Sequence, residues 1–191
     1  MKLRNYIYLL VAGGCFATQA FAHVGLLPRE GVSGTKHAAF SVRAPVEKEI
    51  PTVSLKIEIP SEWKESGGQV DRVQHQDNWQ IEIERDEDDW IKTVRWSGNE
   101  APDYSFIQFG IIITLPKLEG MQQIKAWQEY SDGSVVAWVE DRSEEGVENP
   151  AAALMLHGDK GDGTNVISLG LSGVIGGLLG AGLMLIAGRK R

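Results

Sequence analysis

Apolar and polar residues alternate along the middle of this chain, a pattern typical of β-strands with one buried face. Residues 55–60 form one such series, and residues 79–84 form another. Ser131-Asp132-Gly133 is a turn between two further strands, within the sequence WQEYSDGSVVAW. With the apolar runs at 38–44, 91–96 and 106–115 added, the pattern predicts about seven strands.

These strands predict an all-β fold, an Ig-like or cupredoxin-like antiparallel β-sandwich that runs from His23 to Arg142. The continuous apolar run Ile111-Ile112-Ile113 favours a central position for its strand. No convincing amphipathic helix interrupts the series. From Ser143 to Asn165 the chain becomes polar, small and rich in Gly and Asp, and we interpret residues 143–165 as a flexible tether.

The first 22 residues have the layout of a secretory signal peptide. Lys2 and Arg4 precede a short apolar run from Tyr6 to Ala17, and a small-x-small ending follows at Ala20-Phe21-Ala22. Cleavage after Ala22 would make His23 the first residue of the mature protein. Cys15 follows Ala-Gly-Gly and loosely resembles a lipoprotein processing site, so lipidation of Cys15 is the alternative to cleavage before His23.

The other end of the chain predicts a membrane anchor. Residues 166–188 carry no charge and are long enough for a tilted transmembrane helix, and the basic tail 189–191 follows them. Because basic flanks stay in the cytoplasm, this layout predicts a single-pass cell-membrane protein with its sandwich domain outside the cytoplasm.

Charge narrows the choice of partners. All 26 acidic residues and 14 of the 19 basic residues lie between His23 and Asn165, which gives this segment a net charge of −12. Such a balance argues against nucleic acid and anionic lipid as partners. The one cysteine, Cys15, lies in the leader, so the predicted mature protein has neither a disulfide nor a thiolate metal site.

No catalytic motif is present, and we expect a protein that is not an enzyme. His37, His75 and His157 are scattered and read as surface residues. The carboxylates of residues 85–89, Arg-Asp-Glu-Asp-Asp, are most simply a solvated hairpin tip. Hydrolysis by paired carboxylates would need two such groups converging across a cleft.

His23 has a chemistry that an internal histidine lacks. In a mature chain that begins at His23, the α-amine and Nδ1 of the same residue can close a chelate ring on one metal ion. Both groups are available as neutral donors near neutral pH. A flat set of nitrogen donors favours Cu(II), which heads the divalent affinity series and accepts tetragonal geometry.

Four segments of the chain resemble the YcnI-like copper-binding family of bacterial envelope proteins. The first is Ala22-His23-Val24 with Pro28 after it, and the most specific is the Tyr130–Gly133 turn followed by Trp138. The matching segments, in order, are AHV, FSVRAPVEKEIPTVSLKIEIP, VRWSGNEAPDYSFIQFGIIITLP and IKAWQEYSDGSVVAWVE. The resemblance also covers the leader, the tether and the C-terminal helix.

The resemblance implies a β-sandwich that binds one copper ion through a single-histidine brace at His23, beside a tryptophan that matches Trp138. It also implies an acidic ligand, and Gln108 stands where that residue is expected. An amide oxygen is a weaker donor, so Glu58 or Glu129 is the alternative third ligand. Trp138 cannot be an ordinary ligand because its indole nitrogen only donates, and a place in the core is its alternative role.

Three functions follow from these features. The first is Cu(II) sequestration or delivery outside the cytoplasm, in contact with other envelope copper-handling proteins. The second is a histidine-brace copper oxidase or monooxygenase, which needs a second histidine facing His23, with His37 as the only candidate. The third is a metal-free interaction module. Copper carriers of the CopC type carry a late Asp-x-His ligand pair that this sequence lacks.

Overall fold

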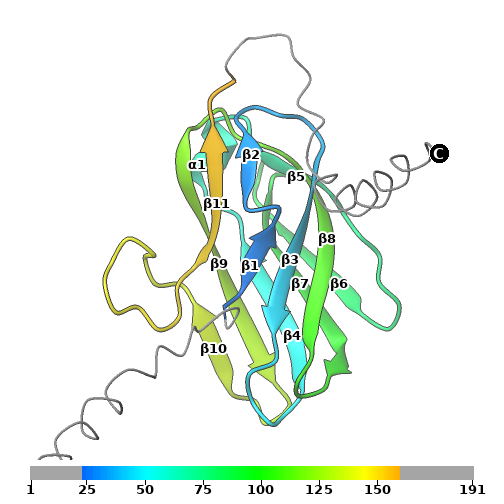
Figure 1. Cartoon of the computed structure of the whole chain (residues 1–191). Coiled ribbons are helices and arrows are strands. Elements are labelled where there is room, and N and C mark those ends of the chain that lie inside the picture. Colours follow the sequence, from blue (N-terminus) through cyan, green and yellow to red (C-terminus); the bar gives the residue numbers. More distant parts are fainter. Residues whose placement is uncertain (1–22, 160–191) are drawn as a thin grey trace, which may run out of the picture. The chain divides into compact units, whose positions relative to one another are not determined.

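The computed structural model describes residues 23–159, which fold into two β-sheets packed face to face (Figure 1). The smaller sheet has the strand order β1-β3-β8-β5. All its pairings are antiparallel. Its strands are β1 (Gly25–Leu27), β3 (Ala38–Pro45), β8 (Phe106–Thr114) and β5 (Gln69–Val73).

The larger sheet has the order β2-β11-β9-β4-β7-β6, and β10 also pairs with β9. The pair of β2 and β11 is parallel, and the other pairs are antiparallel. Its strands are β2 (Glu30–Val32), β11 (Ala152–His157), β9 (Gly120–Tyr130), β4 (Thr52–Glu58), β7 (Ile91–Ala101), β6 (Gln80–Arg85) and β10 (Val135–Trp138).

The core between the sheets is built by the alternation that the sequence displays. Every second residue of β8 and β9 points inward, among them Ile111 and Ile113, and Ile57 of β4 joins them; each of these three is no more than 1% exposed. Phe109 of β8 stacks on Trp96 of β7 with ring centroids 4.7 Å apart. This aromatic pair joins the two sheets across the core.

The all-β sandwich is confirmed, with differences at its ends. The described residues hold eleven strands rather than about seven, and one short helix, α1 (Glu62–Glu65). Strand β8 lies between β3 and β5, so its predicted central position is correct. Strand β6 lies at a sheet edge, and its Ile83 is 41% exposed rather than buried.

The predicted domain end at Arg142 is wrong. Residues 152–157, expected in the tether, form β11 between β2 and β9, where Leu154 and Leu156 are at most 1% exposed. The chain returns to the larger sheet because these two leucines belong to the hydrophobic core. Strand β11 pairs there with the first half of β9. Strand β10 pairs with the second half of β9 along the same edge.

Both predicted targeting segments lie outside the described residues. The leader 1–22, with Cys15, the helix 166–188 and the tail 189–191 therefore stay predictions. Within residues 23–159, no helix is long and apolar enough to cross a membrane.

Candidate metal centre

His23 is the first residue that the structure describes, and it lies two residues before the start of β1. Val24 and Leu26 are each 1% exposed, and they anchor this segment in the core. Gly25 pairs with Arg43 of β3. The same register continued by two residues brings His23 level with Pro45, at the C-terminal end of β3.

The imidazole of His23 contacts the indole of Trp138. The two ring centroids are 5.7 Å apart and the planes make an angle of 80°, an edge-to-face contact. Trp138 comes from β10 of the larger sheet, directly opposite Ala126 of β9, and is 1% exposed. The contact therefore joins the two sheets, and Trp138 is both a core residue and the neighbour of His23.

A buried amide fixes the position of this indole. Trp138 Nε1 donates to Oε1 of Gln128 at 3.3 Å. The amide nitrogen of Gln128 donates to the carbonyl of Pro45 at 2.8 Å and to the Thr52 hydroxyl at 2.7 Å. Because Gln128 is fully buried, these bonds satisfy groups that would otherwise be costly to desolvate.

Sequence reasoning did not identify Gln128. The alternation along β9 could have identified it, because Gln128 is a polar residue at an inward position between Ala126 and Tyr130, which are both buried. The hydrogen bond from the Gln128 amide to the Pro45 carbonyl also links β3 to the larger sheet. Pro45 is the end of β3 that lies beside His23. Gln128 therefore positions both sides of the His23–Trp138 contact.

The donor set at His23 is that of one histidine. Within residues 23–159, no side chain or backbone group forms a hydrogen bond or ion pair with the His23 ring. In the same part of the chain, no three His, Cys, Asp or Glu side chains converge on one point. These residues fit a metal ion held by the nitrogens of His23 itself.

Gln108 lies on the smaller sheet, two strands away from β1. It pairs with Arg43, which pairs in turn with Gly25. Its side chain is exposed, between the buried Ile107 and Phe109 of β8. The structure does not bring Gln108 to the His23–Trp138 contact.

The two glutamates considered as alternative ligands lie on the outer face of the larger sheet. Glu129 follows the inward-facing Gln128 on β9, and its carboxylate pairs with Arg95 at 3.0 Å. Glu58 lies opposite Lys125 and Thr93, between the buried Ile57 and Ile59. The side chain of Trp138 points to the other face, so neither glutamate lies beside it.

The other histidines are held elsewhere. His37 precedes β3 and its Nδ1 lies 3.0 Å from Asp71 of β5. Since Pro45 ends β3 on the side of His23, His37 is roughly 26 Å away along the strand. His75 follows β5, at the opposite edge of the smaller sheet from β1. His157, expected in the tether, ends β11 and lies 3.3 Å from Glu30.

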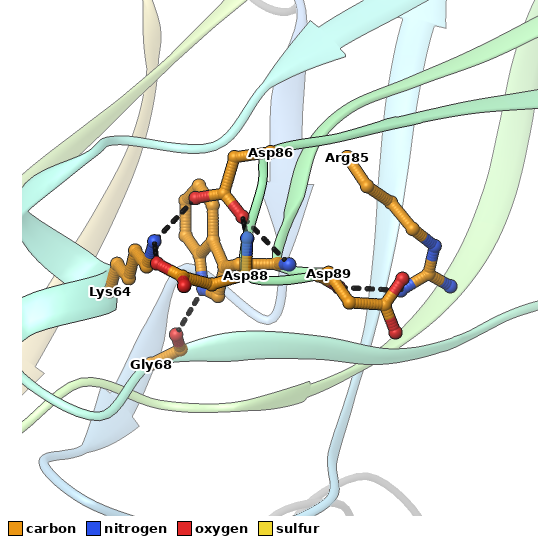
Figure 2. A network of polar contacts seen from close by, with 7 residues as sticks. Lys64, Gly68, Arg85, Asp86, Asp88 and Asp89 are labelled. Carbon is orange, nitrogen blue, oxygen red and sulfur yellow. Dashed lines mark hydrogen bonds and ion pairs between the residues drawn. The ribbon is translucent and has the colours of Figure 1, made fainter.

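The carboxylates of residues 85–89 serve the hairpin between β6 and β7 (Figure 2). Asp86 accepts hydrogen bonds from the backbone N–H groups of Asp88 and Trp90, at 2.9 and 3.0 Å. Lys64 of α1 donates to Asp86 at 2.6 Å, and this bond lowers the pKa of Asp86. The turn prediction is correct, and Asp86 also ties the hairpin to α1.

Comparison with known proteins identifies the family to which this chain belongs. The family model described as Domain of unknown function (DUF1775) matches residues 23–156, which begin at His23 and include β11 except for its last residue. A protein from Nocardia farcinica, whose crystal structure has an immunoglobulin-like fold, is 26% identical with a TM-score of 0.60. The match covers 71% of this chain and 98% of that one.

The Copper-binding protein CutI of Bacillus subtilis (strain 168) is 25% identical over 130 residues. These residues are 66% of this chain and 59% of the relative, so the match spans about three fifths of that protein's length. The fold is immunoglobulin-like, one of the two forms expected from the sequence. The chain belongs to the DUF1775 family, and its resemblance to YcnI-like proteins is confirmed.

Proposed function

We propose that this protein binds one Cu(II) ion through the α-amine and Nδ1 of His23, as the first residue of a mature chain held at the cell membrane. In this proposal the sandwich lies outside the cytoplasm, and the protein sequesters copper or delivers it to other envelope proteins. Residues 1–22 are the cleaved leader, and residues 166–188 are the anchor.

The contact between His23 and Trp138 carries the proposal. The buried indole holds one side of the imidazole, while the ring nitrogens have no partner among residues 23–159. A histidine fixed in place but without a polar partner is prepared for a ligand from solution. The Bacillus subtilis relative, Copper-binding protein CutI, supports copper as that ligand.

Binding rather than catalysis fits the positions of the histidines. A two-histidine brace needs a second imidazole opposite His23, and His37 lies near the far end of β3, held by Asp71. A single chelating residue leaves the other copper positions open to water or to a partner protein. Open positions suit a site that must release its ion.

The test begins with the mature protein recovered from the membrane of an expressing bacterium. Mass spectrometry should find His23 as residue one, and Cu(II) titration should give a type 2 EPR spectrum with nitrogen couplings at one ion per chain. Adding one alanine before His23 converts the amine into an amide. This variant should bind Cu(II) more than about tenfold more weakly, a loss of about 1.4 kcal/mol or more.

His23→Ala should abolish the spectrum, and His75→Ala is the matched control because His75 is exposed and far from β1. Equal Cu(II) affinity in the alanine-extended and native chains would refute the chelate. A mature N-terminus elsewhere, at Cys15 for example, would refute it independently of any metal titration.

A further inference from the structure

The only two methionines among residues 23–159 lie directly opposite each other in the larger sheet. Met121 of β9 pairs with Met155 of β11. In an antiparallel pair, directly opposite residues have Cβ atoms about 4.5–5.5 Å apart. Two flexible thioether side chains therefore start from neighbouring positions on one face.

That face is turned to solvent. Met121 is 40% exposed and Met155 is 38% exposed. Alternation along β11 puts Leu154 and Leu156 in the core and leaves Met155 and His157 outside. Methionine most often fills gaps in a core, so an exposed pair of this kind needs its own explanation.

An imidazole completes the group on the same face. His157 is two residues beyond Met155 on β11, roughly 7 Å along the strand. Its Nε2 lies 3.3 Å from a carboxylate oxygen of Glu30, which is the β2 residue paired with Met155. A proton shared on Nε2 with this carboxylate leaves Nδ1 as a lone-pair donor, as in carboxylate–histidine–metal arrangements.

We infer that Met121, Met155 and His157 form a surface site for Cu(I). Thioether sulfur is a soft ligand that selects Cu(I), and imidazole is a common copper ligand. The site is separate from His23. Met121 is five residues along β9 from Ala126, the partner of Trp138, roughly 17 Å away, and it faces outward whereas Trp138 faces inward.

The site does not depend on the Cu(II) chelate of the proposed function. Its donors lie at another place, differ in chemistry and suit a different oxidation state. A protein with both sites would hold copper outside the cytoplasm in either oxidation state, with no electron transfer between the sites required.

A metal-free role for this face is the competing explanation. Val32 of β2 is 46% exposed beside His157, its Cα partner, so the face could serve as an apolar contact. Replacing methionine by leucine separates the two explanations, because leucine keeps the apolar surface and removes the sulfur. Such exchanges usually cost little stability.

The experiment is an anaerobic competition of the full chain against the Cu(I) chelator bathocuproine disulfonate. The wild-type protein and the His23→Ala variant should both take one Cu(I) ion in this competition. Met121→Leu and Met155→Leu should each weaken Cu(I) binding by more than about tenfold, and the double variant should lose it. All three should keep the Cu(II) spectrum of His23 and the thermal midpoint of the wild type.

His157→Ala should weaken Cu(I) binding as the single leucine variants do, and His75→Ala should not. Unchanged Cu(I) affinity in the Met121→Leu/Met155→Leu double variant would overturn the site and leave the apolar contact as the role of this face. Loss of Cu(I) binding in His23→Ala would also overturn it. Failure of the Cu(II) chelate would appear only in the EPR titration.

Discussion

Replacing Trp138 by phenylalanine removes one hydrogen-bond donor from the buried contact at His23. The Trp138 indole is 1% exposed, and its Nε1 is the donor that reaches Oε1 of Gln128. Phenylalanine keeps an aromatic ring at this position. It leaves the Gln128 oxygen in the core without that donor, while the amide nitrogen keeps its bonds to Pro45 and Thr52.

Two effects set the size of the loss. An acceptor left unsatisfied in the core costs about 1–3 kcal/mol. The smaller ring also leaves unfilled volume, which adds about 1 kcal/mol. The variant should therefore lose about 2–4 kcal/mol of unfolding free energy. For a domain of this size, about 4 °C of thermal midpoint is lost per kcal/mol, so the midpoint should fall by about 8–16 °C.

The assay is thermal and urea unfolding followed by circular dichroism, with Trp127→Phe as the matched control. Trp127 lies on β9 opposite Ala137, next to the Trp138–Ala126 pair. Its side chain is on the outer face of the sheet, whereas that of Trp138 is in the core. The amine of Lys56 lies 4.2 Å from its ring centroid, a contact worth about 1 kcal/mol or less. A Trp138→Phe variant within about 0.5 kcal/mol of the wild type would refute this reasoning. Equal losses in the two variants would refute it as well.

Two further predictions concern the rest of the sandwich. Burial alone would raise the pKa of Asp71, but hydrogen bonds from neighbouring side chains such as Thr114, together with His37, lower it below its usual range. A lowered carboxyl pKa stabilises the fold above the unfolded value of about 3.9, so the stability difference between wild type and Asp71→Asn should shrink as the pH falls below about 4 in urea titrations. A chain that stops after Arg142 lacks β11 and its two buried leucines, whose burial contributes about 1.5–3 kcal/mol each. This shorter chain should show no cooperative unfolding. A chain that stops after Asp159 keeps β11 and should unfold as the full chain does. Cooperative unfolding of the shorter chain at the midpoint of the longer one would show that β11 is dispensable.

Most strands that the sequence predicts are long enough to display a period, and the four-residue β10 was found from the turn before it. Strands β3, β4, β7, β8 and β9 have 7 to 11 residues each and were identified. Strands β1 and β2 have three residues each, too few to show alternation. Strand β11 was missed because polar and small residues surround it and its outward positions carry Met155 and His157. Its burial depends on pairing with β9, which local sequence does not encode.

The candidate site depends on which face of β9 is buried, and the sequence leaves that open. Trp127 and Tyr130 are three residues apart, so strict alternation can bury only one of them. In the structure Tyr130 is inside, together with Gln128, and this choice turns Glu129 outward toward Arg95. Had Trp127 been buried, Glu129 would face the core near Trp138. The pairing of β9 with β4 and β10 thus decides that Trp138 meets an amide and not a carboxylate.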